Sequence, residues 1–272
     1  MKKTVVVVVP VYRDFVPSEA FAFARCLDVL GRYDVSLLHP AGVDLSGVLR
    51  SCPRNVTEKV IGDKWFRGVR GYNSLCLSSG FYGLYEAYEY MLIYQLDAYV
   101  FRDDLADWCA RGYDYVGSPW LPNDNLFQRT LGDGIRLLRR TLCPPGSTER
   151  VTHAQLHYAV GNGGFSLRRI GKMKAVTEAF AAEIARLTFG ESKAQEDVFF
   201  SVYVRRRAGI RVPPWREALR FAFENNPVRA LRETGGRLPF GCHYWSRGKI
   251  WERFWHEYIP FDPKQDGDAY RD

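Results

Sequence analysis

The sequence predicts an α/β fold with a mostly parallel central sheet flanked by helices. Residues 5–9 are five consecutive valines, and such an unbroken β-branched run is typical of a strand buried on both faces. An amphipathic helical pattern begins at Pro17 and ends near Gly31, and a second apolar strand is predicted at residues 35–38. This β-α-β order indicates two parallel strands joined by a crossover helix, the repeating unit of a Rossmann-like, doubly wound sheet.

The rest of the chain continues this alternation of strands and helices. Residues 59–61 are a weak third strand, residues 73–90 carry apolar side chains at helical spacing, and residues 91–94 begin the most apolar strand of the middle region. The further predicted elements are a strand at 99–101, a short helix ending at Cys109, a strand at 114–117, a glycine-rich turn and strand at 160–169, helices at 171–187 and 198–207, and a strand end at 212–215.

The length of 272 residues suits a single domain that spans residues 1–272. With 46% hydrophobic and 25% charged residues, the composition is that of an ordinary globular protein, which argues against disorder. Residues 121–150 are rich in Pro, Asn, Asp, Gly and Arg, and we expect a loop insertion there. From about residue 246 we expect an irregular C-terminal tail.

The net charge of +7 gives a basic surface, which attracts phosphates, nucleic acid or anionic lipid without distinguishing them. The six cysteines are scattered and form no C-x-x-C pair, so no zinc site is indicated and a reducing compartment is favoured. No stretch approaches the ~20 apolar residues that span a bilayer. We therefore expect a cytoplasmic protein that could rest on the inner face of the membrane. Short arginine runs are interpreted as solvated helix faces: Arg136, Arg139 and Arg140; Arg168 and Arg169; Arg205, Arg206 and Arg207.

Asp97 is the acidic residue most readily tied to chemistry. It lies near the end of an apolar strand, where a charge is costly unless it is paired or bound to a metal. Ligands of open α/β sheets bind beyond the carboxyl ends of the strands, and a carboxylate there is a good ligand for a hard cation that bridges to a diphosphate. The alternative is that Asp97 only caps the following turn.

Three further features could carry chemistry. The turn Gly161-Asn162-Gly163-Gly164 allows close approach of the backbone to a ligand, although it is neither a Walker loop nor G-x-G-x-x-G, and it could be a plain tight turn. Glu196 and Asp197 stand at the start of a helix; either could accept a proton from a hydroxyl, or both could simply cap the helix. His243 lies among aromatic residues, as a packed core histidine or as a metal ligand.

The order of these segments resembles a known family. Y-Q-L-D-A-Y-V-F, D-Y-V-G-S-P-W, G-N-G-G-F-S-L-R-R, Q-E-D-V-F-F and a late H-Y-W follow one another as the motifs of GT-A glycosyltransferases do. More closely, the chain is similar to a bacterial domain-of-unknown-function family that is grouped with those enzymes and is often found with surface-polysaccharide genes. The resemblance extends from Val5 to about Trp245, and it implies a GT-A-like fold and a hexosyltransferase-type glycosyltransferase.

The resemblance also implies roles for individual residues. Asp97 would match the last acid of the D-x-D motif, and His243 would complete a site for Mn²⁺ or Mg²⁺. Asp197 would be the acceptor-activating base of an inverting enzyme, with Glu196 as its catalytic neighbour. Gln95 stands where the first acid of D-x-D is expected, and a neutral amide is a weaker cation ligand. Pro10, Val11 and Tyr12 would meet the nucleotide base, and Gln95 would also be a donor-binding residue. Asn162, Gly163 and Gly164, counted with the donor-binding residues, would lie against the donor or acceptor sugar.

The implied reaction transfers a sugar from a nucleoside-diphosphate sugar to a hydroxyl of a saccharide or lipid-linked acceptor, in surface polysaccharide or glycoconjugate synthesis. One alternative is nucleotidyl transfer to a sugar phosphate, but Pro10 to Arg13 do not supply the expected G-x-G-x-R loop. The other is a basic nucleic-acid-binding module, which the charge alone supports. A buried-strand acid does not suit that module, so we expect no nucleic-acid partner.

Overall fold

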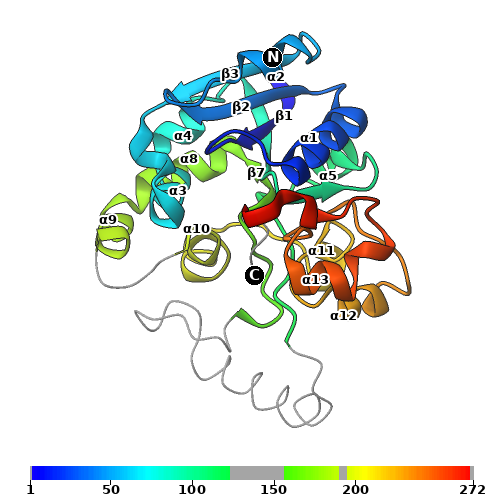
Figure 1. The fold of residues 1–272 in the computed structure, drawn as a ribbon. Helices are drawn as coiled ribbons and strands as arrows, with labels where there is room; N and C mark the ends of the chain where they lie inside the picture. Colours follow the sequence, from blue (N-terminus) through cyan, green and yellow to red (C-terminus); the bar gives the residue numbers. More distant parts are fainter. Residues whose placement is uncertain (1, 123–155, 190–194, 270–272) are drawn as a thin grey trace.

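The computed structural model describes residues 2–122, 156–189 and 195–269 and has a mixed α/β architecture (Figure 1). Its central sheet has six strands in the order β3-β2-β1-β4-β7-β6. The valine run lies within β1 (Lys3–Pro10), which pairs in parallel with β2 (Asp34–Pro40) on one side and β4 (Tyr88–Tyr94) on the other. Strand β3 (Val56–Ile61) pairs in parallel with β2. The predicted parallel sheet is therefore confirmed.

The valines of β1 alternate between two apolar cores because successive side chains of a strand point to opposite faces. Val5, Val7 and Val9 pack under α1 (Pro17–Leu30) and α5 (Leu105–Ala110). Val6 and Val8 pack on the other face. That face is covered by α3 (Gly68–Cys76), α4 (Ser79–Gly83) and α8 (Ile170–Ala179). Both faces of the sheet are thus buried, as the unbroken apolar run requires.

The far side of the sheet is antiparallel. Strand β7 (Phe165–Arg169) runs antiparallel to β4, and the two-residue strand β6 (Tyr115–Val116) runs antiparallel to β7. A second, three-stranded sheet was not predicted from the sequence; its order is β5-β9-β8. It consists of β5 (Ala98–Val100), β9 (Gly241–His243) and β8 (Ala222–Phe223). Because β5 follows β4 after three residues, this small sheet begins at the carboxyl edge of the large one.

The single helix predicted at 73–90 is wrong. The chain instead forms α3, then α4 with Ser78 as its N-cap, and enters β4 at Tyr88. The Ser78 hydroxyl accepts a hydrogen bond from the Phe81 N–H at 3.2 Å, which starts a new helix where the old one has ended. The helix predicted at 198–207 is shorter and consists of α10 (Glu196–Val198) and one π-helical turn, η3 (Phe199–Tyr203).

The C-terminal tail is not irregular as predicted. It contains α13 (Gly248–Arg253), η4 (Trp255–Glu257) and η5 (Pro263–Ala269). Its aromatic residues pack against α1 and the small sheet, which supplies the burial that holds the short helices in place. The loop insertion predicted at 121–150 lies almost wholly outside the described residues. The remaining elements are α2 (Ser46–Arg50), η1 (Asp63–Phe66), α9 (Ala181–Phe189), α11 (Trp215–Ala218) and α12 (Pro227–Glu233).

Two expectations about the chain's environment can be compared with the structure. Among the described residues, Cys26, Cys52, Cys76, Cys109 and Cys242 are all free, and all but Cys52 are buried. Among the same residues, no helix has the length and apolar character needed to cross a bilayer.

The contact between the two sheets provides a test of the fold. A Cβ atom on Gly241 of β9 would lie 2.4 Å from the Phe165 ring of β7. We expect Gly241→Ala to lower the free energy of unfolding by about 1–3 kcal/mol, because the ring is buried and cannot move aside freely. Gly171→Ala in α8 is the matched control, since its Cβ would meet nothing within 4 Å. Chemical denaturation of both variants makes the measurement, and equal stabilities would contradict the close packing.

Candidate functional site

A cavity of about 520 Å³ lies at the carboxyl ends of β1 and β4. Its lining includes all but one of the site residues predicted from the sequence: Pro10, Tyr12, Gln95, Asp97, Asn162, Gly163, Gly164, Glu196, Asp197 and His243. Val11 is the exception. Its side chain is fully buried in the core and its N–H donates to the Leu38 carbonyl at 2.8 Å. The prediction that Val11 contacts a donor is therefore not supported by the position of its side chain.

The path of the chain explains why residues far apart in sequence meet here. Strand β4 ends at Tyr94, and the next three residues turn into β5 at the edge of the sheet. The Gln95 N–H donates to the Gly164 carbonyl at 2.8 Å, which fastens this turn to the glycine-rich segment before β7. Ala98 in β5 pairs with His243 in β9. The turn after β4 thus lies between the glycine-rich segment and the late histidine.

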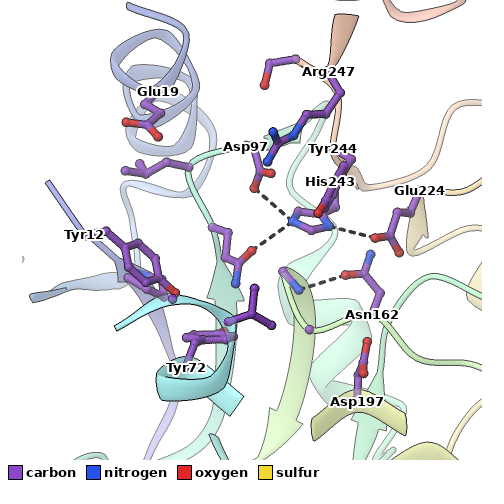
Figure 2. Close-up of a pocket in the computed structure, with 18 of the residues that line it drawn as sticks. Tyr12, Glu19, Tyr72, Asp97, Asn162, Asp197, Glu224, His243, Tyr244 and Arg247 are labelled. Atoms are coloured by element: carbon purple, nitrogen blue, oxygen red, sulfur yellow. Dashed lines mark hydrogen bonds and ion pairs between the residues drawn. The ribbon is translucent and has the colours of Figure 1, made fainter. Parts of the chain in front are cut away.

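His243 is held on both ring nitrogens. Its Nε2 lies 3.0 Å from Asp97 Oδ1 and 3.1 Å from Gln95 Oε1, and its Nδ1 lies 3.1 Å from Glu224 Oε1 (Figure 2). The side chains therefore form a row in the order Asp97, His243, Glu224. Glu224 follows the two-residue strand β8 and lines the cavity. Sequence reasoning missed it because so short a strand leaves no recognisable pattern, and a lone acid after two apolar residues is common.

The charges in this row stabilise one another. Burial alone would lower the pKa of His243, but the carboxylates of Asp97 and Glu224 raise it to about 10. Burial alone would raise the pKa of Asp97, but the charge of His243 and its hydrogen bond bring that pKa below the usual value. The ligand-free row is therefore an imidazolium ion between carboxylates, and the orientation of its ring is fixed from both sides.

The glycine-rich turn is shaped by these neighbours. Asn162 has a left-handed φ of 75°, and its side-chain oxygen accepts a hydrogen bond from the Gly164 N–H at 2.9 Å. A Cβ on Gly163 would lie 2.2 Å from Glu196 Oε1, and a Cβ on Gly164 would lie 2.0 Å from His243 Nε2. The two glycines are thus needed for the approach of the protein's own side chains, which the sequence alone did not indicate.

Glu196 makes a buried ion pair. Its Oε1 accepts from Arg168 Nη2 at 2.8 Å, and both side chains are almost completely buried. The interpretation of Arg168 as part of a solvated face is therefore wrong: β7 carries it into the core, where Glu196 and the Gly163 carbonyl accept hydrogen bonds from its guanidinium. One oxygen of Glu196 is engaged by Arg168, and the other, Oε2, is buried without a hydrogen-bond partner among the described residues.

Asp197 is the half-buried carboxylate next to this pair. Its Oδ1 accepts a hydrogen bond from the Val198 N–H at 2.7 Å, and it lines the cavity. Burial raises its pKa to about 7, helped by the negative charges of Glu196 and Glu224. At neutral pH this carboxyl group is therefore divided between a form that can accept a proton and a form that can return one.

The end of the cavity next to β1 combines aromatic and apolar side chains with the Arg13–Glu19 ion pair. The ring of Tyr12, 38% exposed, stands edge-on to Phe66 with centroids 5.5 Å apart, and Tyr72 lies beside it. Val69, 71% exposed, belongs to the same lining. Arg247 lies between this end and the acidic one. Its guanidinium is 4.9 Å from the Tyr244 ring, and its charge contributes to the low pKa of Asp97.

The cavity therefore changes in character along its length. It offers aromatic rings near Tyr12, cationic groups at Arg247 and His243, and carboxylates at Asp197 and Glu224 (Figure 2). Such an arrangement suits an elongated ligand with a planar group at one end and negative charge in the middle. The far end, where carboxylates gather, suits hydroxyl groups, which can donate hydrogen bonds to them.

Solved structures with the same fold are glycosyltransferases. The galactosyltransferase LgtC, solved in complex with donor and acceptor sugar analogs, superposes with a TM-score of 0.55 at 13% identity, over 96% of this chain and 95% of LgtC. An active-site mutant of LgtC superposes with a TM-score of 0.50 at 17% identity, over 92% of this chain and 90% of the mutant. Apo mouse xyloside xylosyltransferase 1 superposes with a TM-score of 0.51 at 10% identity, over 89% of this chain and 97% of the mouse enzyme. At these identities the likeness concerns the fold, which is the GT-A fold.

The sequence itself matches one family. No curated protein is similar enough to match the chain. The family model described as "Protein of unknown function (DUF5672)" matches residues 55–243, which include the turn after β4, the glycine-rich segment, the Glu196-Asp197 pair and His243. The chain belongs to the DUF5672 family.

Proposed function

We propose that the protein transfers a sugar from a nucleoside-diphosphate sugar to a hydroxyl of a saccharide or lipid-linked acceptor. The observation that carries this proposal is the cavity at the carboxyl edge of a GT-A sheet. There Asp97 and His243 stand beside Arg247, and a carboxylate with a pKa of about 7, Asp197, lines the same cavity. The first three side chains would meet the diphosphate, and Asp197 would act on the acceptor.

The donor would lie along the cavity according to its chemistry. The base would contact the Tyr12 ring and Pro10 at the aromatic end. The diphosphate would meet Arg247, whose guanidinium stacks on Tyr244 and makes no ion pair with a carboxylate among the described residues. The sugar would lie against the turn at Asn162, whose side-chain nitrogen is buried without a hydrogen-bond partner among the described residues.

The residues around His243 Nε2 fit a divalent cation. Ligand atoms on adjacent corners of an octahedral site lie about 3 Å apart, which matches the separations of Nε2 from Asp97 Oδ1 and Gln95 Oε1, 3.0 and 3.1 Å. Glu224 on Nδ1 is the outer partner that fixes a metal-binding histidine. Among the described residues, no group of three His, Cys, Asp or Glu side chains is placed to hold a metal ion together, so phosphate oxygens would have to complete the coordination. When bound, Mn²⁺ or Mg²⁺ would neutralise the leaving diphosphate.

Asp197 would be the general base. It would take the proton of the acceptor hydroxyl as the oxygen forms its bond to the anomeric carbon, while the bond from that carbon to the diphosphate breaks. Attack opposite the leaving group inverts the anomeric configuration. Glu196, held by Arg168, would position Asp197 through the backbone of α10.

We further propose that the reaction belongs to surface polysaccharide or glycoconjugate synthesis. The net charge of +7 would favour contact with an anionic membrane surface. A lipid-linked acceptor would be presented at such a surface.

The first prediction concerns the cation. Manganese or magnesium should tighten nucleoside-diphosphate binding. Asp97→Asn or His243→Ala should reduce this increase in affinity at least about tenfold, because each variant lacks one side chain that would bind the cation directly. Asp97→Asn should also abolish transfer while the circular dichroism spectrum stays that of wild type. Calorimetry with a panel of nucleoside diphosphates, with and without chelator, makes the measurement. Equal nucleoside-diphosphate affinities with and without chelator would show that binding is independent of metal, as the neutral Gln95 in place of an acid would then explain.

The second prediction concerns the base. Asp197→Asn should lower kcat by about 10²–10⁴-fold with little change in donor Kd, because proton abstraction matters only in the transition state. The side-chain oxygen of asparagine can accept the hydrogen bond from the Val198 N–H as the carboxylate does, so the melting temperature should stay near that of wild type. A variant with near-normal kcat would remove Asp197 from the mechanism and leave open another base or a retaining route.

Glu196 provides the contrast to Asp197. Glu196→Gln should lower the free energy of unfolding by on the order of 3 kcal/mol, because it leaves the buried Arg168 guanidinium without its counter-charge. We expect a smaller fall in kcat than for Asp197→Asn once folded enzyme is assayed. Urea denaturation and steady-state kinetics on the two variants separate the roles. The reverse pattern, a large kinetic loss at unchanged stability, would make Glu196 the base.

The fourth prediction follows from the pKa of Asp197. The carboxylate must be deprotonated to accept a proton, and burial raises its pKa to about 7. At saturating donor and acceptor, kcat should therefore rise about tenfold per pH unit below 7 and level off above it. The residual activity of Asp197→Asn should lack this inflection. A wild-type profile that is flat between about pH 5 and 8 would argue against Asp197 as the base.

A further inference from the structure

A second cavity, of about 320 Å³, lies where the chain leaves β6 and meets α12 and α13. These two helices lie together at the lower right of the molecule (Figure 1). Its lining contains no Asp, Glu, Lys or Arg among the residues that the structure describes. That distinguishes it from the first cavity, whose lining includes charged side chains such as Asp97, Glu224 and Arg247. The residues that line it are Trp120, Leu121, Pro122, Leu156, His157, Asn225, Asn226 and Ile250.

Trp120 is held firmly in the wall of this second cavity. Its N–H donates to the Ala159 carbonyl at 3.0 Å, and its own carbonyl accepts from the Tyr158 N–H at 2.8 Å. Its ring lies against Gly161, where a Cβ atom would come within 1.7 Å of the ring. The indole is half-buried and lines the cavity. It is therefore a fixed aromatic surface whose orientation does not depend on a ligand.

The opposite wall is tied to the same segment. Asn226 adopts a left-handed conformation with φ 56° and donates from its side chain to the Leu121 carbonyl at 3.1 Å. Arg229, buried in α12, donates to the Pro122 carbonyl at 2.8 Å and to the Tyr158 hydroxyl at 2.9 Å. These bonds hold the two walls at a set distance, and they leave Asn225 exposed in the lining.

Both walls continue directly into the first cavity. Gly161, against which the Trp120 ring packs, precedes Asn162 in the glycine-rich turn. Asn225 follows Glu224, which faces the first cavity beside His243. The second cavity is therefore next to the acidic end of the first, where Asp197 lies.

We propose that the second cavity binds a neutral sugar ring of the acceptor, stacked on Trp120 and hydrogen-bonded to the side chain of Asn225. An indole face packs well against the apolar face of a pyranose, and an amide both donates to and accepts from hydroxyls. A diphosphate or an acidic sugar would be disfavoured because the described residues of the lining provide no counter-charge. This inference rests on the proposed function, since it assigns the saccharide that receives the transferred sugar.

The experiment uses neutral methyl glycosides and disaccharides as probes, with methyl glucuronide as the charged control. Saturation-transfer NMR on the full chain, with a nucleoside diphosphate present, should detect at least one neutral probe and not the glucuronide. Trp120→Ala and Asn225→Ala should each weaken the affinity of that probe about tenfold, the loss expected for one well-made contact. Val228→Ala is the matched control, because Val228 is 56% exposed on α12 and does not line the cavity.

Nucleoside-diphosphate affinity, measured on the same samples, serves as the check that each variant is folded. Retained nucleotide affinity with lost glycoside binding supports the assignment. The proposal is overturned if no neutral glycoside binds to the wild type. It is also overturned if the Asn225→Ala variant, which changes an exposed side chain, binds the probe as the wild type does. Glycoside binding without any nucleotide binding would instead count against the proposed function while leaving a sugar site at Trp120.

Discussion

The site depends on the ionic row in which His243 is held between Asp97 and Glu224. The row crosses from the turn after β4 to β9 and on to the end of β8, so it connects the large sheet to the small one. An imidazolium buried there would be costly without a carboxylate on each side. The backbone of the glycine-rich turn has to pass close to Nε2, which is why residue 164 has no side chain. The cavity and its row of charges are thus parts of one packing arrangement.

A second buried ion pair contacts the same glycine-rich turn. Arg168 enters the core from β7 and meets Glu196 at the start of α10, beside Gly163. Two neighbouring glycines therefore lie under two different ionic contacts, one that orients His243 and one that orients the segment carrying Asp197. Displacement of this turn would disturb both at once. His243 and the segment that carries Asp197 are therefore positioned by the same glycine-rich turn.

Much of the fold could be predicted because its main signals are local. The valine run, the helix beginning at Pro17 and the apolar strand before Asp97 each show their structure within ten or fifteen residues. The small sheet could not be predicted, because β8 has two residues and β9 three, and their pairing depends on contacts distant in sequence. Glu224 was missed for the same reason. Arg168 was misjudged because its neighbour Arg169 is partly exposed, and alternation along β7 places only one of them in the core.

The carboxylates Asp97 and Asp197, which line the same cavity, differ in the direction of their pKa shifts. Asp97 is kept ionised by His243, whereas the raised pKa of Asp197 reflects its burial and the charges of Glu196 and Glu224. A set of equally ionised carboxylates would repel one another and would also repel a diphosphate. Because Arg168 compensates Glu196 and the single charge of His243 is shared by Asp97 and Glu224, about half of the negative charge of these four carboxylates is neutralised by cations in contact with them. Among the described residues no cation contacts Asp197, and burial leaves it as the lining carboxylate whose pKa is raised to about 7.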